Sequence, residues 1–281
     1  MANTLLQSDV ITRMINEAMT GKEKLMGLAS DLGNLPNGVH AGNTFTIVKY
    51  QHLGEMVDLA KGDTIALEDL VATESQETIE HKAKGFTIFD IEKETTISGK
   101  SLLDSKIADM ADIRVRAIEK SLGGKMAKAP LKYAVASATA VTEAEINLAL
   151  QQAFGDDQDY DTFAGIVVNS KVATGFYTMD GFVKADLTHT QGGNGIVKGG
   201  VIGTFRGIPV IMSDVTTYDT TKNECLTFIV KNGAIGFKIQ AGEVEVARVA
   251  GKKANEVYDD LMFLTGIIND AGVCVLRKTI A

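Results

Sequence analysis

The sequence of 281 residues has no tryptophan, only three prolines and only two cysteines. Cys225 and Cys274 are far apart and neither belongs to a CxxC pair, which argues against a structural disulfide or zinc site and favours a reducing compartment. No apolar run approaches the roughly 18 residues that a membrane span requires. The first 32 residues do not have the charged and apolar regions of a signal peptide.

Basic residues are also scarce relative to acidic ones. The 28 Lys and Arg against 36 Asp and Glu give 28 − 36 = −8. A dedicated nucleic-acid binder carries a basic surplus, so this class is disfavoured. Hydrophobic residues at 45% and charged residues at 23% are ordinary globular values. With 28 glycines against three prolines, the chain bends through permissive backbone rather than rigid turns.

A search for catalytic and metal-binding patterns finds none. The histidines are scattered, at His40, His52, His81 and His189. There is no HExxH, GxSxG or P-loop motif. The glycine-rich segment 192–200 lacks a preceding apolar strand and a Lys-Ser/Thr pair, which favours a flexible loop over a nucleotide site. The acidic run 157–161 has Thr162 and Val168 where a calcium loop needs Gly and Glu, so a solvated loop is favoured. We therefore expect no enzyme activity and no cofactor.

Helical periodicity is clearest over residues 101–126, where apolar residues mark one face and Asp, Arg and Lys the other. Such a helix is about 35 Å long. Shorter helices are predicted over 4–19 and over 142–154, the latter with Thr142 and Glu145 as a capping box. Gly123, Gly124 and Pro130 are expected to end the long helix, and residues 32–42 to form an irregular arm.

Extended segments at 44–50 and 77–82 predict a long hairpin-like excursion with little apolar content of its own. An isolated two-stranded ribbon is marginal in water, so this one should lie on a partner. Lys61, Gly62 and Asp63 mark its tip, where turn chemistry and solubility are the simplest roles and a contact role is the alternative. Extended segments in the middle third of the first half of the chain and at the C-terminus should pair across a long sequence separation.

Beyond residue 130 the pattern alternates between helix and strand. Short strands are predicted at 165–169, 200–203, 208–212, 226–230, 236–239, 244–249, 261–268 and 273–278. Together with the long helix and the excursion, they predict an α+β chain.

The ordered runs 78–90, 200–214, 228–237 and 244–248 resemble the major capsid proteins of tailed bacteriophages. The resemblance covers about residues 40–281 and implies the HK97-type fold. It implies an N-arm at 1–43, an extended β-hairpin loop at 44–77, a peripheral domain at 78–135 and 240–281 with a long spine helix, and an α/β axial domain at 136–239.

The same resemblance implies a virion structural protein that self-assembles through pentamers and hexamers into an icosahedral shell around double-stranded DNA. Assembly would take place in the bacterial host cytoplasm, with a portal, with DNA bound without sequence specificity, and without a membrane. The sequence departs from the family pattern at the front, where no long scaffolding segment precedes the arm, which suggests a separate scaffold protein, a processed chain, or a short arm helix that is sufficient on its own. Some members of the family form a covalent cross-link between a lysine and an asparagine. No motif in this sequence matches that pair, so Lys61 is a candidate to which this role is not assigned.

Two alternatives remain. An encapsulin-like compartment would keep the fold and enclose an enzyme instead of DNA. A soluble α/β enzyme would bind a small ligand with residues 136–239, and it would show a cluster of perturbed titratable groups.

Overall fold

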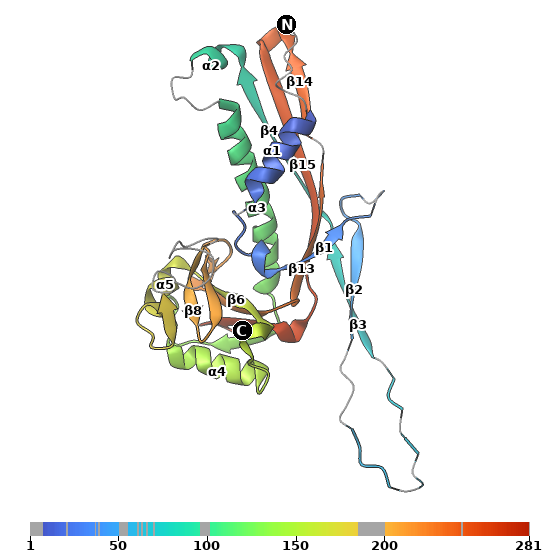
Figure 1. The fold of residues 1–281 in the computed structure, drawn as a ribbon, viewed down its shortest axis with the longest axis vertical. Helices are drawn as coiled ribbons and strands as arrows, with labels where there is room; N and C mark the ends of the chain where they lie inside the picture. Colours follow the sequence, from blue (N-terminus) through green and yellow to red (C-terminus); the bar gives the residue numbers. More distant parts are fainter. Residues whose placement is uncertain are drawn as a thin grey trace.

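The computed structural model describes residues 8–20, 22–36, 38, 40–50, 56–60, 62, 64–65, 67–69, 71–95, 102–184, 200–242 and 244–280. A long helix lies along an elongated sheet at one end of the molecule and reaches a rounded α/β lobe at the other (Figure 1). A thin ribbon leaves the elongated sheet and projects away from both.

The long helix is α3, Leu102–Met126, as the periodicity predicted. Ile107, Ile118 and Leu122 lie on its buried face. Asp104 in the first turn and Lys125 in the last suit the helix dipole. The expected role of the two glycines is wrong, because α3 continues through Gly123 and Gly124 to Met126 before the chain turns toward Pro130.

The elongated sheet is built on β15, Ala254–Ile267. β4, Glu80–Phe89, pairs antiparallel with it over ten positions, from Phe89 opposite Ala254 to Glu80 opposite Phe263. This confirms the predicted pairing across a long sequence separation. On its other side β15 pairs with β14, Glu245–Val249, and then with β13, Ile235–Ala241.

The fifth strand of this sheet is β1, Ser30–Asn34, which pairs in parallel with β13. Its position corrects the expected irregular arm, of which the first residues are a strand. β1, β4, β13, β14 and β15 form what we call the five-stranded sheet. α2, Asp90–Thr95, follows β4 directly.

The N-terminal segment packs on its own subunit. α1, Ser8–Met19, buries Ile11 and Ile15 completely against α3 and the five-stranded sheet. A 3-10 turn, Met26–Leu28, follows and lies beside the fully buried Leu25. The described residues of the arm between 8 and 34 are therefore part of the subunit core.

The rounded lobe holds a sheet in the order β5-β16-β12-β6-β9-β8-β7, which we call the seven-stranded sheet. Its strands are β5 Leu131–Ala134, β6 Phe163–Val168, β7 Phe182–Lys184, β8 Val201–Phe205, β9 Ile208–Met212, β12 Thr227–Lys231 and β16 Val273–Arg277. The small pair β10, Tyr218–Asp219, and β11, Glu224–Cys225, lies outside it.

Both faces of the seven-stranded sheet are covered. α4, Glu143–Phe154, and α5, Ser170–Phe176, pack on one face with Ile166 and Val168. Val167 points to the other face, where the end of α3 lies. Because both faces are covered, the side chains on both sides of β6 are buried. This explains why the sequence of β6 is a continuous apolar run rather than an alternating one. The capping box of Thr142 and Glu145 at the start of α4 is confirmed.

Strand pairing differs from the expected division at three strands. β5 and β16, placed in the peripheral region by sequence, lie in the seven-stranded sheet, and most of β13 was placed in the axial region but lies in the five-stranded sheet. The physical reason is burial: Val275 and Leu276 of β16 point to opposite apolar clusters, which only a sheet covered on both faces supplies. Within the described residues, no helix is both long and apolar enough to cross a membrane.

The core of the five-stranded sheet contains a buried ion pair. Arg114 of α3 donates from Nε to Asp259 Oδ2 at 2.7 Å, and both side chains are almost fully buried. Arg114 also donates to Asn16 Oδ1 of α1 at 3.0 Å. One guanidinium thus joins the helix, the sheet and the arm.

We expect Asp259→Ala to lower the free energy of unfolding by about 3–5 kcal/mol, because it leaves the Arg114 charge buried without a partner. The double variant Arg114→Met with Asp259→Leu should lose much less of its free energy of unfolding, because neither buried charge remains. Urea unfolding of both variants measures the difference. A double variant as unstable as the single one would show that the pair itself supplies the stability.

Candidate functional site

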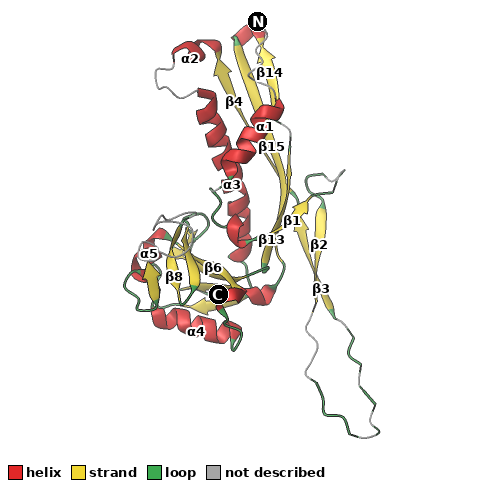
Figure 2. Ribbon diagram, in the orientation of Figure 1, coloured by secondary structure: helices red, strands yellow, loops and turns green. Residues whose placement is uncertain are grey.

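The projecting ribbon consists of β2, Thr44–Tyr50, and β3, Ala72–Thr78, paired in register from Thr44 opposite Thr78 to Tyr50 opposite Ala72 (Figure 2). Contacts along the paired strands hold the ribbon against the body of the subunit, among them two ion pairs and one apolar contact. Lys49 Nζ lies 2.6 Å from Asp270 Oδ1, and Lys125 of α3 pairs with Glu77. The third is apolar, between Ile47 and Gly266.

Gly266 permits that third contact. A Cβ at this position of β15 would lie 2.5 Å from Ile47 Cδ1, so a larger residue here would displace the end of the Ile47 side chain. The base of the ribbon is therefore rigidly placed by the subunit core, and its far end is left to reach away from it.

Between the two strands, the described residues of the loop 51–71 present apolar side chains to solvent. Met56 and Leu67 are exposed to 103% and 94%, and the others that are more than half exposed are Val57, Leu59, Ile65 and Val71. Single exposed apolar residues are normal, but a run of them on one projecting segment marks an interaction site. This loop is the strongest candidate functional site of the chain.

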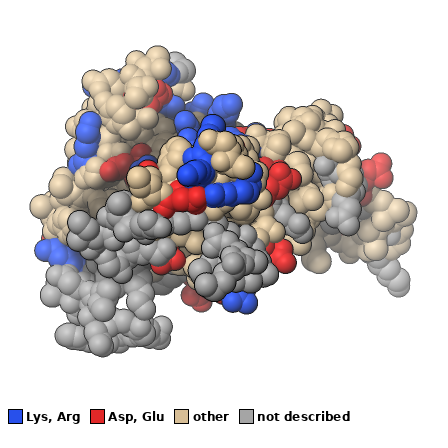
Figure 3. Space-filling view, turned by 90° about the horizontal axis from the view of Figure 1, so that it is seen from above, with Lys and Arg blue, Asp and Glu red and all other residues tan. Residues whose placement is uncertain are grey.

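The loop is also acidic. Residues 51–71 contain Glu55, Asp58, Asp63, Glu68 and Asp69 against a single Lys61, so 1 − 5 = −4, half of the net charge of the chain. By contrast, the end of the molecule seen in Figure 3 shows basic and acidic side chains side by side. The loop therefore combines apolar contact area with a charge of one sign.

Of the predicted tip residues, only Gly62 lies among the described residues. It is exposed with φ at +103°, a conformation that favours glycine, and a Cβ there would meet no heavy atom within 4 Å. Lys61 and Asp63 lie outside the described residues, so the contact role stays a prediction. Sequence reasoning singled out these polar residues and gave no role to the apolar ones. The missed signal was the row of Met, Val, Leu and Ile between two strands with no core beside them.

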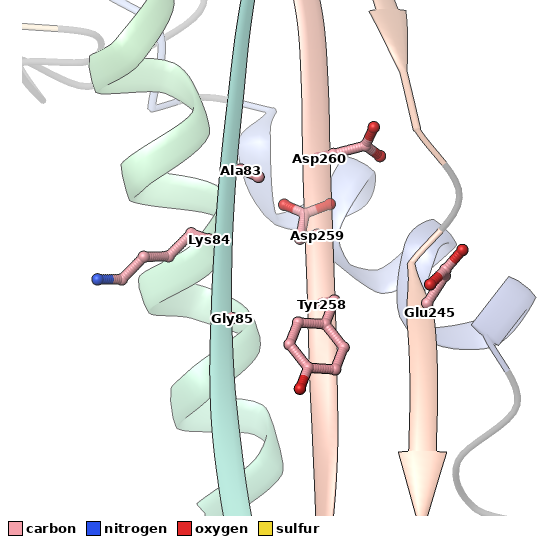
Figure 4. Close-up of a pocket in the computed structure, with 7 residues that line it drawn as sticks. All are labelled: Ala83, Lys84, Gly85, Glu245, Tyr258, Asp259 and Asp260. Carbon is pink, nitrogen blue, oxygen red and sulfur yellow. The ribbon is translucent and has the colours of Figure 1, made fainter.

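The open face of the five-stranded sheet carries a hollow of about 410 Å³ (Figure 4). Tyr258 lies across it beside Gly85, with Glu245 and Asp260 to one side in the figure. A Cβ at Gly85 would approach Tyr258 Cδ1 to 3.0 Å, so this glycine makes room for the ring. His81 Nε2 lies 3.1 Å from Asp260 Oδ2. The hollow is open, and its lining has no nucleophile next to a base.

Both cysteines are buried, and Arg277 forms ion pairs with both Asp219 and Glu224. Burial raises the pKa of Cys274 to about 12, which keeps this thiol protonated and unreactive. Among the described residues, no three His, Cys, Asp or Glu side chains lie close enough together to hold a metal ion. His52, His189 and most of the glycine-rich segment 192–200 lie outside them.

A buried carboxylate holds the arm against α3. Glu119 Oε1 accepts backbone N–H groups of Lys24 at 2.6 Å and of Leu25 at 2.8 Å. Burial raises the pKa of Glu119 above its ordinary value, although these hydrogen bonds act in the lowering direction. The carboxylate fixes the arm where it passes between the two sheets.

No protein-family model matches the chain, and no curated protein is significantly similar to it in sequence. Solved structures match over most of its length. The PhiM1 mature capsid aligns with a TM-score of 0.61 and 11% identity over 92% of this chain and 88% of that one. A structure from Mycobacterium phage Che8 aligns with a TM-score of 0.59 and 16% identity over 85% and 86%.

A third match is the holo-SrpI encapsulin complex from Synechococcus elongatus PCC 7942, with a TM-score of 0.58 and 11% identity over 86% of this chain and 83% of that one. The chain has the HK97-type fold. The expected fold class, α+β with a long helix and an extended hairpin, is confirmed. At these identities the HK97-type likeness shows the fold alone.

We expect Glu119→Gln to change how stability depends on pH. A carboxyl whose pKa is higher in the folded chain binds its proton more tightly there. Its contribution to the free energy of unfolding therefore falls as pH rises from about 4.3, the ordinary value, through the raised value. The glutamine variant lacks this fall.

Urea unfolding of both proteins at a series of pH values from about 4.3 upward measures the two curves. The difference between them isolates Glu119, because the other carboxyl groups are the same in both proteins. Parallel curves would contradict the raised pKa.

Proposed function

We propose that this chain is the structural subunit of an icosahedral phage capsid, assembled through pentamers and hexamers around double-stranded DNA. The observation that carries the proposal is the loop of residues 51–71, fixed at its base and covered with exposed apolar side chains. Such a loop gains stability only by burial on another molecule, and the HK97-type fold supplies a class of proteins in which that molecule is a second copy.

The proposed role is structural and not enzymatic. The partners are other copies of the chain, a separate scaffold protein, a portal and packaged DNA, in a virion assembled in the host cytoplasm. We keep the proposed N-arm, extended loop, peripheral domain and axial domain, with β5 and β16 moved to the axial domain and β13 to the peripheral domain. An acidic subunit suits a shell whose inner face must release DNA freely.

A second shell remains a candidate. The similarity to the encapsulin structure favours a compartment that encloses an enzyme. The two shells differ in contents and not in fold, so nucleic acid and protein inside purified particles distinguish them.

The deciding experiment is negative-stain electron microscopy of the expressed chain, alone and with a scaffold protein from the same genome. Closed hollow particles or rings of five and six subunits are expected. A homogeneous 30 kDa monomer under all these conditions would overturn the proposal and favour the soluble enzyme.

Replacing residues 51–71 with Asn-Gly should leave a folded subunit that no longer assembles. Tyr50 and Ala72 face each other in the ribbon, so a two-residue turn can join them. Circular dichroism and urea unfolding test the fold, and electron microscopy tests assembly. Loss of the fold would show that the loop belongs to the core.

A milder change tests the apolar side chains. Ile65→Gln should raise the protein concentration needed for assembly about tenfold or more, because burying an isoleucine is worth about 1.5–3 kcal/mol. Ile280→Gln, at an exposed isoleucine near the C-terminus, is the matched control. Both should change the free energy of unfolding by less than about 0.5 kcal/mol. Equal effects on assembly would show that position in the loop is irrelevant.

A further inference from the structure

The last turn of α3 makes an unusually close contact with the α/β lobe. A Cβ built on Gly123 would lie 1.6 Å from Thr216 Oγ1 and 2.8 Å from Thr216 Cβ. Neither distance is possible between real atoms, so any other residue at position 123 would push α3 and the segment between β9 and β10 apart. Glycine is required here for close approach and not for a bend, because α3 continues past it.

Thr216 adds a second constraint at the same point. Its φ is +58°, in the left-handed region that β-branched residues rarely adopt. A strained residue of this kind persists only when its surroundings hold it in place. The strained backbone of Thr216 and its close approach to Gly123 occur at one contact. Here α3, which packs on the five-stranded sheet, meets a turn that belongs to the seven-stranded sheet.

A network of buried hydrogen bonds holds the turn. Thr217 Oγ1 donates to Ser213 O at 2.6 Å, and Asn169 Nδ2 donates to Thr217 Oγ1 at 2.9 Å. The backbone N–H of Leu226 donates to Thr217 O at 2.7 Å, and that of Ser213 to Val168 O at 3.0 Å. The side chains of Asn169, Ser213 and Thr217 are all buried. The turn is thus a rigid part of the seven-stranded sheet.

On the other side of the contact, α3 is a rigid part of the five-stranded sheet. Val115, Ile118 and Leu122 pack on Phe263 and its neighbours. One turn later, Met126 enters the apolar cluster on the seven-stranded sheet. Gly123 lies between these two sets of contacts, where the helix passes from one rigid body to the other.

We propose that the contact of Gly123 with Thr216 is a joint that sets the angle between α3 and the seven-stranded sheet. A second step rests on the proposed function: by setting this angle, the joint also sets the curvature of the assembled shell. In a shell whose subunits meet through both parts of each copy, a small change of this angle is repeated at every contact. The joint is a positioning device and needs no ligand.

Three variants test the joint. Gly123→Ala inserts the clashing Cβ. Thr216→Gly removes both the strained backbone and the side chain that contacts Gly123, so it should fold at least as well as the natural protein. Gly124→Ala is the matched control, since a Cβ at that position of the same helix meets no heavy atom within 4 Å.

The angle is measured in the subunit itself. Spin labels on Lys120→Cys in α3 and Gln152→Cys in α4 report their separation by double electron–electron resonance, with the native Cys225 and Cys274 buried. We expect Gly123→Ala to shift the mean distance, Thr216→Gly to broaden its distribution, and Gly124→Ala to change neither. Unchanged distributions in both test variants, each folded by circular dichroism, would overturn the joint.

Curvature is measured separately, from particle diameters in electron micrographs. Thr216→Gly should give a broader range of diameters than the natural protein and Gly124→Ala the same range. Changed label distances with unchanged diameters would overturn the link to curvature. If the natural protein forms no particles, the proposed function fails, while the label distances still decide whether the joint exists.

Discussion

The structure depends on one helix being shared between two hydrophobic cores. Along α3, Ile107 and Met110 pack with α1, then Ile118 and Leu122 pack with the five-stranded sheet, and Met126 ends in the cluster on the seven-stranded sheet. Most of the stability of a helix in a protein comes from tertiary packing, so burial at successive turns holds α3 in place. The two sheets are placed relative to each other because both are packed on this helix.

The arm completes the same arrangement. Leu25 and Leu28 pack on the same face of the seven-stranded sheet as the end of α3, beside it. Glu119 of α3 accepts the backbone N–H groups of Lys24 and Leu25. The cost of burying this carboxylate appears as its raised pKa. The arm thus contributes to the interior of its own subunit, and the loop of residues 51–71 is the segment that leaves apolar surface uncovered.

Sequence reasoning found what local pattern controls. The periodicity of α3, the capping box of Thr142 and the strand β9 depend on residues close in sequence, and all three were predicted closely. β1 was missed because Gly33 and Pro36 are turn signals, while its pairing with β13 is a tertiary contact. Gly123 was misread for the same reason, since the Thr216 that requires a glycine there is distant in sequence.

Sequence reasoning located the loop through Lys61, Gly62 and Asp63 at its tip, whose contact role stays a prediction, and gave no role to the exposed apolar residues. Polar residues at a hairpin tip attract attention because they suggest specific contacts. Exposed Met56, Ile65 and Leu67 are easily overlooked in a sequence, because an apolar residue is normally expected to be buried in its own subunit. Only the three-dimensional arrangement shows that the ribbon carries them away from every core of the chain.

The combination of apolar area and negative charge on the loop has a physical rationale in the proposed shell. Apolar side chains supply affinity wherever they are buried, without distinguishing the correct surface from another loop. Four net negative charges make two loops repel each other, so free subunits resist association through their loops before assembly. A correct receiving surface must then be both apolar and free of matching negative charge, which adds selectivity to a contact that the hydrophobic effect alone would leave unselective.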